Sequence, residues 1–395
     1  MKLSSALFSA ILLIFLILRP TAAKPDPTTK QKLNELSNRI SAFESNWNRL
    51  RIGGNLAITS NTFYNQTKQT LSSLNFEQEL GLYLDAFLDR NLSTSLRLTH
   101  SGYWGNKYNS SEYTSSQMES PLQLDEAFLR LEYPTALNYL GRFRFSLSQL
   151  GLISDFYTDP VEGFSLQKTY RQFHGIILYS RVYTELQADY GIIEDVSAED
   201  YLGLRLGWTN SNNLIGINLL PNGVTGERSF SLDWSHEWPG QKVTIEAAWY
   251  SFKPAPDSNV DPIDWVPGIL VSYGRVLSKN NYLQLKGGYF GDNFLPSYSS
   301  LAHNSGDDRE WFLPNSYGGE LYLRNQLRPG LAWDNRILAL KPVHFYDTST
   351  DIYHFASYLT KSFSPVNQLQ FGVEAKRLNT NVKNNRIFLS WNFQF

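Results

Sequence analysis

Seven charged residues in the first half of the chain could act on a passing solute through the charge of their side chains. They are Arg97, Arg130, Arg142, Arg144, Asp155, Asp159 and Glu162. If the arginines faced the acids across water, the field between them would orient polar solutes and set an ion preference. This chemistry is electrostatic selection, and it makes or breaks no covalent bond. The alternative is that the arginines form local ion pairs with acids on their own face, which are Glu77, Glu79, Glu126 and Glu132.

The histidines and cysteines give little support for catalysis or for a metal centre. The chain has six histidines and no cysteine, and no pair of histidines has the HExxH spacing of a zinc site. His303 stands close to Asp307, Asp308 and Glu310 and could bind a cation, but a solvated polar loop is the favoured interpretation. We therefore expect no enzyme activity, no cofactor and no metal.

The elements that must position the seven charges are strands, because apolar and polar residues alternate over most of the chain. In LNFEQELGLYLDAFLD, residues 74–89, the even positions are nearly all apolar and the odd positions are mostly polar or acidic. This length suits a bilayer-crossing strand of ~9–11 residues better than the ~5–6-residue strands of soluble sheets. We predict about eighteen strands, with sixteen as the alternative, near 51–60, 74–88, 92–103, 123–133, 137–147, 172–180, 183–192, 201–209, 213–220, 228–236, 241–251, 267–277, 282–290, 316–325, 329–340, 351–361, 367–377 and 386–395.

The connections between these strands alternate between short and long. The connections after the even-numbered predicted strands are short, for example 89–91, 134–136 and 210–212. Those after the odd-numbered strands are mostly longer, for example 104–122 and 148–171. Tight turns at one end and long loops at the other are typical of an up-and-down barrel in an outer membrane. The predicted fold class is therefore an all-β, transmembrane, antiparallel up-and-down β-barrel that occupies residues 51–395.

The last ten residues, RIFLSWNFQF, indicate how such a barrel closes. They alternate in the same way and carry no charge between Ile387 and Phe395. An open sheet edge in hydrocarbon would leave backbone groups unpaired at several kcal/mol each, so the last strand must pair with the first. A soluble β-sandwich, the alternative, would place charge on the outward face of its last strand.

The N-terminal residues differ from the rest of the chain. Lys2, an apolar run at 6–18 and small residues ending at Ala23 predict a signal peptide over 1–23. Residues 24–50 then form a linker and an amphipathic helix whose apolar residues are spaced by three and four. This short periplasmic helix could be a coiled-coil stalk that associates chains, or it could pack on or plug its own barrel. The near balance of 35 basic and 37 acidic residues, without a basic run, argues against nucleic acid as a partner.

With these features the chain resembles Gram-negative outer-membrane porins, and its helix is similar to that of stalked porins. The resemblance rests on the signal peptide, the alternating strands, the turn asymmetry and the terminal Trp391, Phe393 and Phe395. In porins a last strand that ends in Phe is the assembly signal read by the barrel assembly machinery. The resemblance therefore implies location in the cell outer membrane, contact with its lipid, and a homotrimer.

A barrel of this size leaves an aqueous channel, so the expected function is passive diffusion of small hydrophilic solutes and ions. The third external loop constricts general porins, and by position this loop is 149–171, which carries the three acids named above. We therefore expect the loop to fold into the lumen opposite Arg97, Arg130, Arg142 and Arg144. The alternative is a plugged structural or adhesive barrel that acts through its long external loops or its N-terminal helix.

Overall fold

The protein forms one antiparallel sheet that closes on itself. A computed structural model describes residues 49–65, 70–71, 75–105, 122–154, 160–184, 197–221, 226–253, 261–296, 312–344, 351–378 and 382–395. The predicted signal peptide, and the predicted helix up to residue 48, lie outside these described residues. Among the residues that the structure describes, no helix is long and apolar enough to cross a membrane.

The sheet has nineteen strands, and each pairs with its neighbours in chain order. Because the two-residue β2 pairs only with the end of β1, eighteen strands form the wall. The strands are β1 Leu50–Asn65, β2 Thr70–Leu71, β3 Asn75–Asp89, β4 Leu92–Gly105, β5 Gln123–Tyr133, β6 Ala136–Phe143, β7 Val161–Tyr170, β8 Phe173–Thr184, β9 Ser197–Thr209, β10 Asn213–Pro221, β11 Glu227–Trp238, β12 Gln241–Phe252, β13 Ile263–Ser278, β14 Asn281–Phe290, β15 Ser316–Arg328, β16 Leu331–Pro342, β17 Ile352–Ser364, β18 Asn367–Leu378 and β19 Val382–Gln394.

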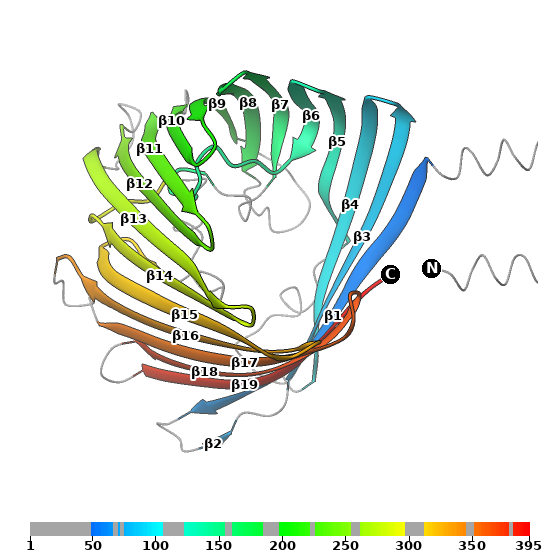
Figure 1. Ribbon diagram of the computed structural model, residues 1–395, viewed down its shortest axis with the longest axis vertical. Helices are drawn as coiled ribbons and strands as arrows, with labels where there is room; N and C mark the ends of the chain where they lie inside the picture. Colours follow the sequence, from blue (N-terminus) through cyan, green and yellow to red (C-terminus); the bar gives the residue numbers. More distant parts are fainter. Residues whose placement is uncertain are drawn as a thin grey trace, which may run out of the picture.

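Closure is made by the first and last strands, as the sequence predicts. β1 pairs with β19 from Asn55 opposite Gln394 to Asn65 opposite Asn384. Beyond that ladder, the Gly54 amide donates to the Phe395 carbonyl at 2.9 Å, and the Phe395 amide donates back to the Gly54 carbonyl at 3.0 Å. Figure 1 shows the strands following one another around a ring, with the C-terminus beside β1.

The two-residue period separates an apolar outer surface from a more polar inner one. On β9, Leu202 and Leu206 are 44% and 70% exposed, whereas Gly203 and Arg205 between them are buried. In an isolated chain, strongly exposed leucines that alternate with buried polar residues define a barrel whose outside is apolar. The short turns after β3, β5, β7, β9, β11, β13, β15 and β17 all lie at one end, which confirms the predicted asymmetry.

The predicted number of strands is correct, but the sequence reading missed β7 at Val161–Tyr170. The predicted strand at 172–180 coincides with β8, Phe173–Thr184, whereas most of the predicted strand at 183–192 lies outside the described residues. The predicted loop 149–171 is therefore shorter at its far end, and the connection from β6 to β7 is 144–160. The turn that sequence reasoning missed contains Arg171, a non-glycine residue with φ of 54°, and carries no Gly, Pro or Asn to mark it.

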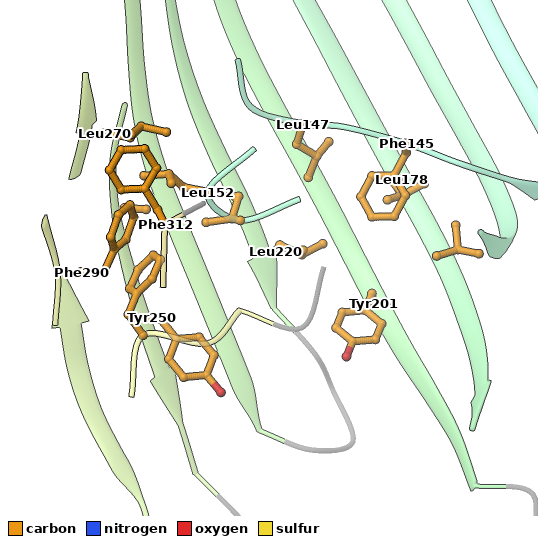
Figure 2. Packing of buried hydrophobic residues seen from close by; sticks show 14 of the residues in the cluster. Phe145, Leu147, Leu152, Leu178, Tyr201, Leu220, Tyr250, Leu270, Phe290 and Phe312 are labelled. Carbon is orange, nitrogen blue, oxygen red and sulfur yellow. The ribbon is translucent and has the colours of Figure 1, made fainter. Parts of the chain in front are cut away.

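An apolar cluster lies inside the barrel, against the inner face of β6–β17. It gathers side chains of the wall with those of two connections that turn inward, and Figure 2 shows fourteen of its members. Its members include Leu147, Leu152, Tyr201, Leu220 and Phe290. Part of the lumen is therefore filled by protein at the level of this cluster.

Candidate functional site

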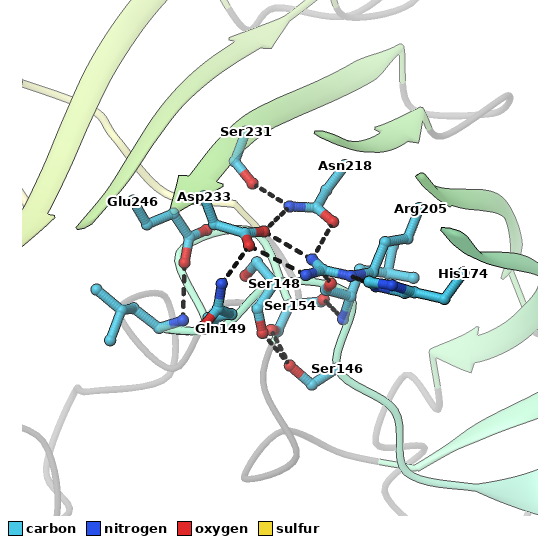
Figure 3. Close-up of polar contacts among 12 residues, drawn as sticks. Ser146, Ser148, Gln149, Ser154, His174, Arg205, Asn218, Ser231, Asp233 and Glu246 are labelled. Carbon is cyan, nitrogen blue, oxygen red and sulfur yellow. Dashed lines mark hydrogen bonds and ion pairs between the residues drawn. The ribbon is translucent and has the colours of Figure 1, made fainter. Parts of the chain in front are cut away.

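The segment 144–154, which follows β6, is held against the inner wall by Arg205 of β9. The Arg205 guanidinium is almost fully buried and donates to the Leu147 carbonyl. It also donates to Asp233 of β11 at 2.6 and 3.0 Å, and to Asn218 of β10 at 2.6 Å. Its Nε lies 3.1 Å from His174 Nε2. Figure 3 shows how these side chains converge on Arg205. One side chain therefore ties the inward segment to four strands.

Two further wall carboxylates bind the segment directly. Asp233 accepts a hydrogen bond from the Gln149 side chain at 2.6 Å, and Glu246 of β12 accepts one from the Leu150 amide at 2.9 Å. Both carboxylates are buried, and they occupy neighbouring register positions on β11 and β12. A buried carboxylate is stable only when it is paired or hydrogen-bonded, so these contacts favour the inward position of the segment.

The segment is also closed on itself and packed by apolar contacts. Ser154, which is fully buried, accepts a hydrogen bond from the Leu147 amide at 2.7 Å. A β-carbon placed on Gly203 would lie 2.9 Å from Leu147 Cδ1 and 3.0 Å from Leu178 Cβ. Leu147 therefore fits onto β9 because Gly203 has no side chain, and Leu152 and Ile153 are buried beside it.

A second inward turn follows β14. Phe290, Phe294 and Phe312 are buried, with ring centroids 5.9 Å apart for the first two and 5.7 Å for Phe290 and Phe312. The rings of Phe294 and Phe312 lie over Gly268 and Gly288, where a β-carbon would come within 2.6 and 3.0 Å of them. The described lumen is thus narrowed from two sides by aromatic and aliphatic side chains seated on glycines of the wall.

Arg97 and Arg130 lie on the inner face of the barrel, as expected, but each makes an ion pair along the wall. Arg97 is 3.1 Å from Glu126, and Arg130 is 2.6 Å from Glu132. This is the local pairing that the sequence left open as the alternative. Their side chains remain 51% and 40% exposed, so both still present charge to the lumen.

The other predicted charges are not gathered on the opposite side of a pore. Arg142 pairs with Glu162 at 3.3 Å, and these two residues hold register positions of the outer face, in line with the exposed Leu140 and Phe164. This corrects the inner placement inferred from sequence. The physical reason is that Tyr139 and Phe143 of β6 face inward and pack on the apolar cluster. On β6, therefore, the apolar residues do not identify the face that contacts lipid.

Arg144 and two of the acids complete the predicted set. Arg144 leads into the inward segment and lies 2.5 Å from Asp125, on the neighbouring strand β5. Asp155 and Asp159 lie outside the described residues. That Asp155 and Asp159 face the arginines across the lumen therefore stays a prediction.

The wall opposite the inward segment carries an excess of positive charge. Across the inner face of β14–β19 we count five cations, Lys286, Arg324, Arg336, Lys376 and Arg386, against three carboxylates, Glu320, Asp334 and Glu374. Arg336 lies 2.9 Å from Glu320 and Arg386 lies 3.7 Å from Glu374. Five positive minus three negative charges leave this part of the wall with two positive charges in excess.

The sequence reasoning missed the anchor of the inward segment. Arg205, Asn218, Asp233 and Glu246 stand on four successive strands at positions that the register brings side by side. A signal was present, because each is a polar residue at an inner position between apolar outer ones. Among the described residues, no group of three or more histidines, acids or cysteines is arranged to hold a metal ion.

The proposed assembly signal lies on the outer surface at the seam. Trp391, Phe393 and Phe395 are 50%, 37% and 50% exposed, and Trp391 donates its indole hydrogen to Asn367 at 2.8 Å. The three rings therefore form an outward stripe near the short-turn end of β19.

Comparison with known proteins finds no matching family model and no matching curated protein. Solved structures do match. OccK8 (OprE) of Pseudomonas aeruginosa aligns with a TM-score of 0.62 at 11% identity, over 88% of this chain and 98% of its own. OpdK of the same organism, solved with vanillate, aligns at 0.60 and 10% identity over 87% and 98%. OccK2 (OpdF), solved with glucuronate, aligns at 0.60 and 11% identity over 88% and 96%. The chain therefore has the closed barrel fold of Gram-negative outer-membrane porins.

Proposed function

We propose that this protein is a passive diffusion channel of a Gram-negative outer membrane, with segment 144–154 as the main narrowing of its lumen. The observation that carries the proposal is the closed wall of eighteen strands, apolar outside and polar inside. Barrels of 16–18 strands are wide enough to enclose an aqueous channel. The protein lets small hydrophilic solutes and ions pass and performs no catalytic step.

The experiment that tests this function is single-channel recording in a planar bilayer. We expect stepwise insertion events with a fixed conductance increment. Absence of conductance from folded protein would favour the competing candidate, a plugged structural or adhesive barrel. That candidate has one observation in its favour, since buried apolar residues of the two inward turns fill part of the lumen.

Small anions, and carboxylates in particular, are the proposed preferred solutes. Two features support this preference, namely the two excess positive charges on the inner face of β14–β19 and the vanillate and glucuronate in the structures of two porins of this fold. The measurement is the reversal potential in a salt gradient. We expect anion selectivity, which should weaken in the Arg324→Gln variant, because this side chain is 52% exposed to the lumen.

The stripe of Trp391, Phe393 and Phe395 is the proposed recognition signal for the barrel assembly machinery. Its exposure on the last strand supports this role. Substitution of Phe395 by Ser should lower the amount of barrel in the membrane more than substitution of Phe363, an equally apolar and 63% exposed residue of β17. Equal losses for both variants would show that exposed aromatic area alone matters.

A further inference from the structure

Two exposed cations lie on the outer surface of the barrel at its long-loop end, Lys341 on β16 and Arg377 on β18. Neither forms an ion pair with any residue that the structure describes. At the same end of β6 and β8 the outward cations do form ion pairs with acids of the next strand, Arg142 with Glu162 at 3.3 Å and Arg181 with Asp200 at 2.9 Å. The charges of Lys341 and Arg377 are therefore left to a partner outside the chain.

The acid nearest to these cations in the sheet does not neutralise them. Asp351, the residue before β17, accepts a hydrogen bond from the Tyr353 hydroxyl at 3.3 Å. On the other side of Arg377, Lys383 of β19 holds the facing register position. Lys341, Arg377 and Lys383 against one acid, three positive charges minus one negative, leave this edge of the outer surface with two positive charges in excess.

Both cations stand at the upper limit of the apolar band. Lys341 is ten positions beyond Leu331, the first residue of β16, and Arg377 is ten positions beyond Asn367, the first residue of β18. Ten residues span ~33 Å along a strand, and a strand tilt of about 40° reduces this to roughly 25 Å of height. The apolar band of an outer-membrane barrel is also ~25 Å tall. The two charges therefore lie at the level of the lipid headgroups.

Each cation has a tyrosine beside it. Tyr317 of β15 is the register partner of Lys341, and Tyr353 of β17 is the register partner of Arg377. The two rings are 45% and 44% exposed. Such rings are typical of the membrane interface, which places the cations at the same boundary by an independent criterion.

The surface below Lys341 is apolar and bare of large side chains. Gly287, Gly319 and Ala339 are register neighbours on the outer faces of β14, β15 and β16. A β-carbon on Gly287 would meet no atom closer than 3.9 Å. Ala339 lies two positions below Lys341 on the same face of β16. An acyl chain can therefore lie close to the sheet directly beneath a headgroup that binds Lys341.

We propose that the outer surface of β14–β18 binds a phosphorylated glycolipid of the outer leaflet. Lys341 and Arg377 bind phosphate groups of its headgroup, and an acyl chain covers Gly287, Gly319 and Ala339. Basic side chains at this depth attract anionic lipids and form charge-assisted hydrogen bonds with phosphate. Because β16 and β18 are two strands apart, the cations are about 10 Å from each other across the sheet, which suits a headgroup with two phosphates.

A lipid explains this surface better than a protein does. The tyrosines and the apolar residues below the cations are those of an ordinary lipid-facing wall, and only the unpaired charges are unusual. The proposed contact lies outside the barrel and does not depend on whether the lumen conducts.

Native mass spectrometry of the detergent-solubilised barrel tests the contact, with diphosphoryl lipid A as the probe. We expect wild-type protein to retain one lipid A per chain. The double variant Lys341→Gln with Arg377→Gln should bind it about 30-fold more weakly, because each basic side chain near an anionic lipid contributes roughly fivefold. Circular dichroism shows whether each variant is folded. Wild-type affinity in the folded double variant would overturn the proposal.

Two controls separate a site from a general effect of charge. Arg275→Gln with Lys361→Gln removes two outward cations at the short-turn end, and Arg228→Gln removes a lone exposed cation at the long-loop end of β11. Both should keep wild-type affinity for diphosphoryl lipid A. A loss as large as that of the Lys341 and Arg377 variant would show that net charge alone decides binding.

The probe itself is then varied. Lipid A without its phosphate groups should bind weakly, and millimolar inorganic phosphate should not displace diphosphoryl lipid A. Tight binding of the phosphate-free lipid, displacement by inorganic phosphate, or a protein that occupies this surface in native membranes and excludes lipid A would each contradict the proposal.

Discussion

Arg205 is the side chain on which the inward position of segment 144–154 depends most. It is 5% exposed and reaches Leu147, Asn218 and Asp233 at once. Removing one member of a buried ion pair leaves the other charge uncompensated. The contact is therefore structural rather than catalytic, and its loss should be felt both in stability and in the width of the channel.

We predict that Arg205→Met lowers the free energy of unfolding by about 3–5 kcal/mol. The measurement is urea unfolding in detergent, followed by circular dichroism. In bilayers the same variant should show larger or noisier conductance, because the segment is no longer held. The double variant Arg205→Met with Asp233→Leu should recover much of the stability, since neither member of this buried ion pair is then left without its partner.

Arg97→Met is the control for that prediction. The Arg97 side chain is 51% exposed in its ion pair with Glu126, and pairs open to solvent contribute less than about 1 kcal/mol. An effect on stability as large as that of Arg205→Met would show that burial does not decide the contribution of these arginines.

A second prediction at this scale concerns Gly203, the seat of Leu147. Gly203→Leu should displace Leu147 and destabilise the inward segment by about 1–3 kcal/mol, because the added atoms have no space. Gly287→Leu, which has open space, should be nearly neutral. The readouts are the unfolding midpoint and the single-channel conductance, and equal values for the two variants would contradict the packing described.

At the scale of elements, the inward segment is the part of the structure that sets the open area of the lumen. Replacing 145–153 by a glycine and serine chain of equal length removes the apolar contacts of Leu147, Leu152 and Ile153 with the wall. We predict a larger conductance increment in planar bilayers with the barrel still folded. An unchanged increment would show that the narrowing lies elsewhere, for example at Phe290, Phe294 and Phe312.

Sequence alone predicts most strands because hydrocarbon imposes a strict two-residue alternation on them. β3, β9 and β18 follow that alternation, and on β3 the apolar even positions lie on the outer face, as the pattern predicts. β6 was assigned the wrong way round, since Tyr139 and Phe143 are apolar but face the inward segment. The alternation shows which face of a strand contacts apolar surroundings. It does not show whether these surroundings are lipid outside the barrel or a loop inside it.

The candidate site was harder to predict than the strands, because its contacts join residues far apart in sequence. Arg205 binds Leu147 and Asp233, which stand 58 and 28 residues away. The inward turn of the third long connection was expected from its apolar residues, whereas its partners on the wall could be named only once the register was known.

For the whole molecule, the seam between β1 and β19 decides whether the wall is complete. Deletion of Phe395 removes two backbone hydrogen bonds with Gly54, each contributing roughly 0.5–1.5 kcal/mol. We predict a lower unfolding midpoint and a smaller yield of folded protein in membranes. A deletion of equal size in the turn 279–280, between β13 and β14, should spare the seam, and greater harm from that deletion would contradict the prediction.

The seam also fixes an order in time. Asn55 meets Gln394, so the chain cannot close until its final residues have been synthesised and exported. Before that moment the chain is an open sheet with two edge strands, whose unpaired backbone groups readily pair with other chains. A chain that lacks β19 would remain such an open sheet, because β1 would have no partner on that side.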